Sequence, residues 1–207
     1  MKDFPVENAP DIEHALKLIH LRFDQLNSEQ FASALAPLTE IEFAERMNSL
    51  PWKMHRYLFS GIVSNAGQYR NKKDPKQGII YFGPNQQFTG YKPYDITSGV
   101  KEACSFLPKY SINPILCVVR FYQLFVYIHP FYDANGRIGR FITNIYLNYH
   151  GLHLSWKKLH QNQRWLKKLN DCHKRYGQRT YEQYLQILIS HWEKFILRKE
   201  DIEPPQE

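Results

Sequence analysis

Twelve residues near the middle of the chain, from His129 to Arg140, contain side chains that could act together in phosphate chemistry. The imidazole of His129 can take up a proton near neutral pH, and the carboxylate of Asp133 is a hard oxygen ligand that suits Mg²⁺. Arg137 and Arg140 are three residues apart, so a helix would place both guanidinium groups on one face, where they can grip phosphate oxygens. We therefore expect a proton acceptor, a metal carboxylate and an anion site in one segment.

The residues between these side chains predict the local backbone. Pro130 should end the preceding helix near His129, because a residue before proline is disfavoured in helical conformation. Residues 133–136 predict a tight polar turn, in which Asn135 and Gly136 can take positive φ. A new helix should follow at once, and its free backbone N–H groups would point into the turn and attract an anion.

Two apolar helices should hold this segment in place. Asn113 and Pro114 are a cap and a first helical residue for a helix that continues to Ile128 and is apolar all round, as expected of a buried central helix. The second helix is expected from about Arg137 to His150.

The rest of the chain predicts further helices and one exception. Thr39 and Glu42 have capping-box spacing ahead of a short helix, and Pro51 should open a separate helix. Other helix starts are marked by caps at Asp11, Ser155 and Thr180. The exception is residues 78–90, where β-branched and aromatic residues surround a turn-rich middle. The predicted fold class is therefore all-α, mainly helical, with a small β-hairpin flap near residues 78–90.

The composition fits a single folded domain. A chain of 207 residues with 43% hydrophobic residues can bury a core, which excludes disordered and low-complexity proteins. No apolar run is long enough to cross a membrane, and no apolar signal core follows Met1, so we expect a cytoplasmic protein with no membrane partner. The three cysteines form no CxxC pair, which disfavours a disulfide framework or a cysteine-rich zinc site.

The positive charge is unevenly distributed. The 27 lysines and arginines exceed the 20 acidic residues by 7, and the excess lies mostly between Lys157 and Arg179. This stretch also carries Trp165 and Tyr176, so it could bind single-stranded nucleic acid through phosphate contacts and base stacking. A solvated helix face is the alternative interpretation.

The residues from His129 to Arg140 match the signature of the Fic family, HxFx[D/E][G/A]NGRxxR, at every fixed position. Residues 54–59, 66–70 and 151–156 also resemble family segments, so the similarity covers about residues 50–160, and the predicted hairpin lies where the family has its target-docking flap. The resemblance implies a Fic fold divided into an N-terminal helical extension (1–48), a Fic core with C-terminal helices (49–197) and a disordered tail (198–207).

The resemblance further implies a protein adenylyltransferase with ATP as co-substrate and Mg²⁺ as cofactor. His129 would be the general base for a Tyr, Thr or Ser hydroxyl of a target protein, which attacks the α-phosphate of ATP and releases pyrophosphate. Asp133 would hold Mg²⁺, and Phe131 would anchor the loop in the core. Asn135 and the amides around Gly136 would line the anion site, Arg137 would bind the phosphate tail, and Arg140 the terminal phosphate. An extended segment of the target would pair with the flap residues Ile79, Ile80, Tyr81 and Phe82.

Gly136 bears on which group the resemblance implies is transferred, an adenylyl or a phosphoryl group. The Doc branch of the fold phosphorylates its targets and has lysine at this position, so glycine favours adenylyl transfer. Transfer of UMP or phosphocholine by the same scaffold stays open. A nucleic-acid-binding helical module with an inactive Fic loop is the alternative of a different class.

Regulation is the last implied property. Many Fic proteins carry an inhibitory [S/T]xxxE[G/N] motif whose glutamate pairs with the second arginine, here Arg140. The N-terminal glutamates lack Ser or Thr four residues before them, and Ser190 and Glu193 are one residue short of the spacing. We therefore expect a small antitoxin protein that supplies the glutamate in trans, with a divergent element of this chain acting in cis as the alternative.

Overall fold

The computed structural model describes residues 10–74, 76–162 and 164–201. Within these residues the chain is mainly helical, with two antiparallel sheets of two strands each, which confirms the all-α class and the small hairpin. The helices are α1 (Ile12–Asp24), α2 (Ser28–Leu35), α3 (Glu40–Phe59), α4 (Ile96–Ser105), α5 (Pro114–Ile128), α6 (Asn135–Tyr149), α7 (Trp156–Gln161), α8 (Arg164–Arg175) and α9 (Tyr181–Trp192). The strands are β1 (Tyr81–Phe82), β2 (Phe88–Thr89), β3 (Leu152–Leu154) and β4 (Ile196–Arg198).

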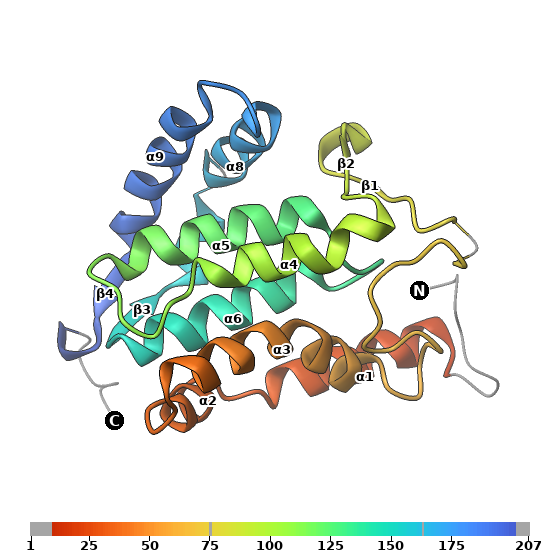
Figure 1. The fold of residues 1–207 in the computed structure, drawn as a ribbon. Coiled ribbons are helices and arrows are strands. Elements are labelled where there is room, and N and C mark those ends of the chain that lie inside the picture. Colours follow the sequence, from red (N-terminus) through yellow and green to blue (C-terminus); the bar gives the residue numbers. More distant parts are fainter. Residues whose placement is uncertain (1–9, 75, 163, 202–207) are drawn as a thin grey trace.

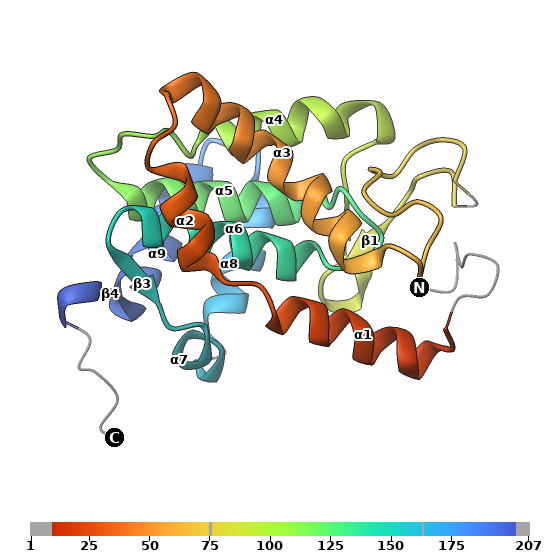
Figure 2. The ribbon, with the colours of Figure 1, turned by 90° about the horizontal axis from the view of Figure 1, so that it is seen from below.

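Helices α5 and α6 pack against each other at the centre of the molecule. Figure 1 shows α1, α2 and α3 on one side of this pair and α8 and α9 on the other, and Figure 2 shows the same arrangement from below. Phe121, Phe125 and Ile128 of α5 have no exposed surface, which confirms the expected central buried helix. The loop between α5 and α6 is therefore held at both ends by core packing.

Side-chain caps fix where several helices begin. Thr39 and Glu42 form the predicted capping box at α3. The Asp11 carboxylate accepts from the His14 N–H over 2.9 Å, and the Asn113 side chain accepts from the Leu116 N–H over 2.9 Å, directly before Pro114 at the first position of α5. Asn148 lies near the other end of α6, where its side chain donates to Ser28 of α2 over 2.9 Å.

Helix α3 corrects the expectation of a separate helix at Pro51. The structure has one continuous helix of 20 residues, with Pro51 in its interior. Proline has no N–H to donate to the carbonyl four residues earlier, so the Met47 oxygen lacks its helical partner. The thiol of Cys104 on α4 donates to this oxygen over 3.6 Å. A side chain from α4 thus replaces the donor that proline lacks.

The two ends of the Fic core were expected at residues 48/49 and 197/198. The first of these divisions falls inside α3, which runs without a break from Glu40 to Phe59. At the second, β4 extends to Arg198 and pairs it with Leu152, and Lys199–Asp201 form a short 3₁₀ helix, so this part of the predicted tail has regular structure. Residues 202–207 lie outside the described residues.

Three negative findings apply to the part of the chain that the structure describes. Cys104, Cys117 and Cys172 are all free thiols. No three His, Cys, Asp or Glu side chains gather there in a way that could hold a metal ion by themselves. No helix there has the length and apolar character needed to cross a membrane.

Candidate active site

The loop between α5 and α6 begins with an abrupt helix end. The His129 N–H still donates to the Phe125 carbonyl over 3.2 Å, but His129 itself has φ 54° and ψ 59°. This left-handed conformation confirms that the helix stops at the residue before Pro130. The turn directs the chain away from the axis of α5 and leaves the His129 side chain at its end.

The other end of the loop differs from the prediction. Positive φ occurs at Ala134, with φ 63°, and not at Asn135 or Gly136. Those two residues already belong to α6, because the Ala134 carbonyl accepts the first helical hydrogen bond, from the Ile138 N–H over 2.9 Å. The turn therefore closes one residue earlier than expected, and the residue with positive φ is Ala134, directly before Asn135 and Gly136.

Asn135 braces the loop from inside. Its side-chain oxygen accepts from the Phe131 N–H over 3.0 Å, and its side-chain nitrogen donates to the Phe131 carbonyl over 2.8 Å. Because both polar atoms of the amide are used in this way and the residue is only 3% exposed, the side chain fixes the loop. What Asn135 can offer an anion is its backbone N–H.

Phe131 is the core anchor that was expected. It is 1% exposed and stacks on the ring of His55, with ring centroids 4.1 Å apart and an interplanar angle of 7°. The Nδ1 atom of His55 accepts from the Gly67 N–H over 2.9 Å, and burial lowers the pKa of His55 to about 3. A neutral histidine on α3 thus supports the loop and ties it to the segment that follows α3.

Arg70 binds four carbonyls from three separated parts of the backbone beside the loop. Its guanidinium donates to the carbonyls of His129 over 2.7 Å, Ile128 over 3.1 Å, Tyr91 over 3.0 Å and, at short range, Gly78. The side chain is 1% exposed, and burial lowers its pKa to about 10. A cation at the C-terminal end of α5 satisfies carbonyls that have no helical partner. Arg70 therefore fixes the end of α5 and both ends of the flap.

The His129 ring is held in one tautomer. Its Nδ1 atom lies 3.1 Å from the Val126 carbonyl, and since a carbonyl can only accept, Nδ1 carries the proton. The lone pair on Nε2 is then the one that can accept a proton. Burial lowers the pKa of His129 to about 4, and the hydrogen bond with the Val126 carbonyl and the nearby carboxylate of Asp133 raise it by less. The ring is therefore neutral at pH 7.

The flap lies over this histidine. In the hairpin, Tyr81 pairs with Thr89 and Phe82 pairs with Phe88. The Phe82 ring stacks on the His129 ring with centroids 4.4 Å apart, while Tyr81 is 57% exposed. Of the other predicted flap residues, Ile79 is exposed and Ile80 is half-buried. The strand alternation thus turns Phe82 toward the site and Tyr81 toward solvent.

The start of α6 provides positive electrostatic potential next to His129. No side chain in the described part of the chain caps this helix, so its first N–H groups have no side-chain acceptor. The Arg137 guanidinium lies 3.2 Å from the Asp133 carboxylate, and the guanidinium carbon of Arg140 lies 5.9 Å from the centre of the Trp156 ring. Both arginines lie in the first two turns of α6.

Some of the site was not foreseen from sequence. Arg70 and His55 occur in segments that resemble the family, but no spacing pattern indicated their contacts with the loop. Tyr122 was expected only as part of the apolar central helix and Trp156 only within the segment 151–156, and both lie beside Arg140. The sequence gives no indication of these contacts, because Tyr122 and Trp156 lie on different helices from Arg140.

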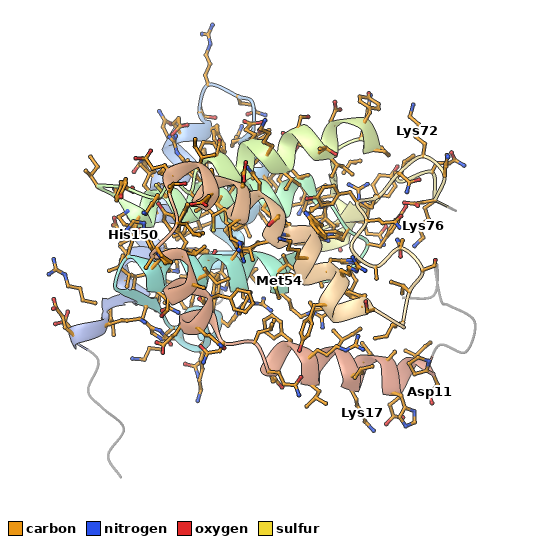
Figure 3. All side chains as sticks on the ribbon, turned by 60° about the horizontal axis from the view of Figure 1, so that its bottom comes forward. Asp11, Lys17, Met54, Lys72, Lys76 and His150 are labelled. Carbon is orange, nitrogen blue, oxygen red and sulfur yellow. The ribbon has the colours of Figure 1, made fainter. Side chains whose placement is uncertain are left out.

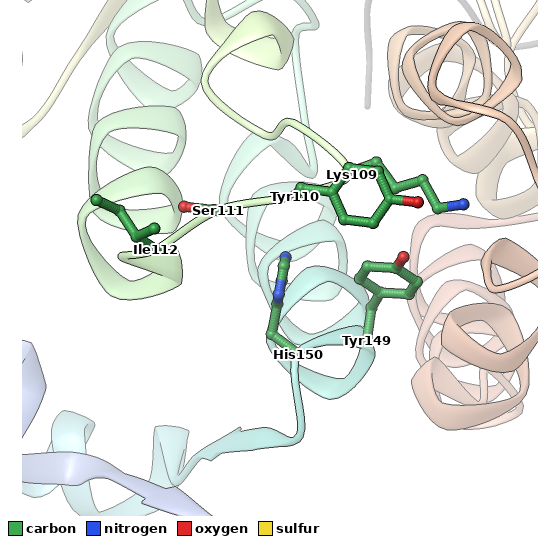
Figure 4. Close-up of a pocket in the computed structure, with 6 residues that line it drawn as sticks. All are labelled: Lys109, Tyr110, Ser111, Ile112, Tyr149 and His150. Atoms are coloured by element: carbon green, nitrogen blue, oxygen red, sulfur yellow. The ribbon is translucent and has the colours of Figure 1, made fainter.

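A cavity of about 550 Å³ lies elsewhere in the molecule. It is lined by residues around the far end of α6 and the loop before α5: Lys109, Tyr110, Ser111, Ile112, Tyr149 and His150 (Figure 4). Figure 3 places His150 at the end of the molecule opposite to Lys76, which contacts the Tyr132 ring of the candidate site. This cavity is therefore separate from the loop that carries the chemistry.

The basic segment runs through α7 and α8, and its cations on α8 line a groove with residues of α9. One cavity of about 360 Å³ is lined by Arg164, Lys167, Lys168, Asp171, Tyr184 and Ile187. A second cavity, of about 350 Å³, shares Lys168 and Ile187 with the first and adds Lys194 and His191. Burial lowers the pKa of His191, and the nearby cations Lys168, Lys194 and Arg164 lower it further. This groove has a strongly positive potential.

Comparison with known proteins gives a family match and a fold. The Fic/DOC family model matches residues 49–147, a range that contains α5, the loop and nearly all of α6. The chain is similar to a Fic domain containing signalling protein from Bacteroides thetaiotaomicron, with a TM-score of 0.60 and 17% identity over 91% of this chain and 72% of that one. No curated protein sequence matches this chain.

Two further solved structures come from Bartonella effector proteins. The N-terminal Fic domain of one from Bartonella sp. AR 15-3 has a TM-score of 0.60 and 19% identity over 91% of this chain and 86% of that chain. BepC from Bartonella tribocorum, solved with bound AMPPNP, has a TM-score of 0.54 and 11% identity over 94% of this chain and 96% of that chain. At these identities the structural likeness shows the fold.

Proposed function

We propose, from the premise that this chain carries a Fic/DOC family domain, that it is a transferase that moves AMP from ATP to a Tyr, Thr or Ser hydroxyl of a target protein. The observation that carries the proposal is the position of His129. Its neutral ring has Nε2 free to accept a proton, and the loop that it begins leads directly into an uncapped helix N-terminus that carries Arg137 and Arg140. A base next to an anion site is the arrangement that hydroxyl attack on a phosphate requires.

The proposed transfer step uses these groups in turn. The target hydroxyl gives its proton to Nε2 of His129 while its oxygen forms a bond to the α-phosphorus of ATP. The bond from the α-phosphorus to the oxygen of pyrophosphate breaks, and pyrophosphate leaves. The N–H groups at the start of α6, together with Arg137 and Arg140, stabilise the negative charge of the phosphates.

Asp133 fits the magnesium ion that the resemblance implies. Its Oδ1 atom accepts from the Ala134 N–H over 2.5 Å and lies 3.2 Å from the Arg137 guanidinium. Its Oδ2 atom makes no hydrogen bond with the described residues. Mg²⁺ commonly binds through one carboxylate together with phosphate oxygens and water. When bound, the ion would neutralise negative charge on the phosphates.

The flap supplies a place for the target. β1 pairs with β2 on one side, and no other strand of the described residues pairs with β1. An extended target segment could add to this edge and bring a hydroxyl to His129 without a sequence requirement. Because Phe82 stacks on His129, the same segment would have to share the space over the ring with Phe82.

Gly136 supports adenylyl transfer over phosphoryl transfer. A Cβ atom placed on Gly136 would lie 3.8 Å from an Arg140 nitrogen and 4.0 Å from the Tyr122 hydroxyl. A lysine at this position, as in the Doc branch, would therefore direct a second cation toward the place of the terminal phosphate. UMP and phosphocholine remain the alternative transferred groups.

The test uses ATP labelled at either the α- or the γ-phosphorus, added to cell lysate with the purified protein. The intact protein should transfer the α-label to a protein band, and His129→Ala should abolish this transfer. His153→Ala is a matched control, because His153 is an exposed histidine in β3. Transfer of the γ-label, or transfer of the α-label by His129→Ala, would show that the proposed reaction is wrong.

We also propose that a separate antitoxin protein inhibits the enzyme by supplying a glutamate to Arg140. Among the described residues, no carboxylate forms an ion pair with Arg140. Glu193 lies exposed in a 3₁₀ turn after α9. The protein purified alone should therefore be active. A silent protein that Glu193→Gly activates would instead indicate inhibition in cis.

A second candidate function is supported by the basic groove of α8 and α9. Arg164, Lys167 and Lys168 line it against the single acid Asp171, and Tyr184 could stack on a base. A protein that binds nucleic acid here should do so with an affinity that falls steeply as salt increases. Stabilisation by ATP and Mg²⁺ in a thermal shift assay, without salt-dependent DNA binding, favours the transferase alone.

A further inference from the structure

Arg140 has an unusual set of neighbours for a surface arginine on a helix. Its guanidinium lies over the Trp156 ring, 5.9 Å from the centroid. One of its nitrogens and the Tyr122 hydroxyl lie 3.8 Å and 4.0 Å from the point where a Cβ on Gly136 would be. The side chain thus extends back toward the first turn of α6, where the free N–H groups are.

Trp156 is a rigid support for this arginine. Its indole N–H donates over 2.7 Å to the side-chain oxygen of Asn144, which lies one turn after Arg140 on α6. The ring also packs against Trp192 with centroids 5.2 Å apart and against Tyr122 with centroids 5.5 Å apart. A tryptophan held by one hydrogen bond and two rings offers Arg140 a fixed face for a cation–π contact.

Tyr122 approaches Arg140 from α5. The residue is 3% exposed, and burial raises the pKa of its hydroxyl, while the nearby positive charge of Arg140 lowers it by less. A guanidinium has only donors, so Arg140 does not use the proton of the Tyr122 hydroxyl. That proton could be donated to an anion that Arg140 binds.

The neighbours of Arg140 leave its charge intact. Arg137 lies 3.2 Å from the carboxylate of Asp133, whereas no described carboxylate pairs with Arg140. An aromatic face and a neutral hydroxyl fix the position of the guanidinium without neutralising it. Such an arrangement suits a group that must bind a highly charged phosphate.

We propose that Tyr122 and Trp156 complete a subsite for the terminal phosphate of a nucleoside triphosphate. Trp156 acts as a positioning residue for Arg140, and Tyr122 donates a hydrogen bond to a terminal phosphate oxygen. The subsite distinguishes a triphosphate from a diphosphate. This inference rests on the proposed function, because it assumes that ATP binds at α6.

The test compares the affinities of ATP and ADP, each with Mg²⁺, by titration calorimetry. All variants are made on His129→Ala, which should bind nucleotide without turnover. Tyr122→Phe should weaken ATP about tenfold, as expected for a lost hydrogen bond to a charged group, and leave ADP within about twofold. Trp156→Leu should weaken ATP about threefold to tenfold with the same selectivity, since it removes the aromatic face.

Two further variants separate positioning from folding. Trp156→Phe keeps an aromatic face and should recover part of the preference for ATP over ADP. Trp52→Leu is a matched control, because Trp52 is a half-buried tryptophan on α3, and it should leave both affinities unchanged. Equal losses for ATP and ADP, or an unchanged ATP affinity in Tyr122→Phe, would overturn the subsite. Loss of nucleotide binding in the parent, or α-label transfer by it, would instead count against the proposed function.

Discussion

Replacing Arg70 with lysine should destabilise the fold strongly, although the charge is retained. The guanidinium reaches its carbonyls through three nitrogens: Nε bonds His129, one terminal nitrogen bonds Gly78, and the other bonds both Tyr91 and Ile128. The single nitrogen of lysine can serve at most the last pair. Two buried carbonyls then lose their donors, at about 1–3 kcal/mol each, so the expected loss is about 4 kcal/mol. For a chain of this length, that corresponds to a Tm lower by roughly 8–16 °C.

The assay is thermal and urea unfolding of the full chain, with Arg22→Lys as the control. Arg22 bonds the carbonyls of Leu58 and Ser60, both at 2.9 Å, from one and the same nitrogen. A lysine nitrogen can reproduce that pattern, so the control should lose under about 1 kcal/mol. If Arg70→Lys also lowered the free energy of unfolding by no more than about 1 kcal/mol, the conclusion that Arg70 stabilises the fold through its four carbonyl contacts would be refuted.

Three other perturbations test the same site. Acidification from about pH 6.5 to pH 4 should destabilise the native state, because burial lowers the pKa of His55 to about 3 and that of His173 to about 4, so that the unfolded chain binds protons that the native chain does not. Tm measured as a function of pH checks this, and a Tm that stays constant over that range would contradict it. Phe82→Ala should expose His129 and raise its pKa from about 4 toward the ordinary 6.5, which would move the acidic limb of the pH–activity profile upward. Asn135→Leu should lower the rate of AMP transfer at least about tenfold, because it removes the two hydrogen bonds that fix Phe131, while the affinity for ATP changes less. An equal loss of transfer rate and ATP affinity would mean that the Asn135 side chain contacts the nucleotide.

Sequence patterns predicted the parts of the fold that depend on near neighbours. The caps at Asp11, Thr39 and Asn113 act over three residues, and each is present with the expected hydrogen bonds. The hairpin at residues 78–90 is likewise a local pattern. The single long helix through Pro51 could not be predicted this way, because its missing donor is replaced by Cys104, which is 57 residues from Met47 along the chain.

The same distinction explains what could be predicted of the site. The segment from His129 to Arg140 indicated a base, a carboxylate and two arginines, because their spacing is fixed by one loop and one helix. It could not indicate how the loop is held, since Arg70 lies 59 residues from His129 and the Phe82 ring reaches His129 from a different element. Nor could it show that the Asn135 amide is used on Phe131.

These distant contacts determine the chemical state of His129 more than its own segment does. Arg70 fixes the backbone at the end of α5, and Phe82 covers the ring, so the histidine is neutral and oriented before any nucleotide binds. A sequence with the same twelve residues but without a buried arginine at position 70 would retain the side chains that react. It would lose the pre-organised geometry in which general-base catalysis is effective, because a misplaced base gains little from its type alone.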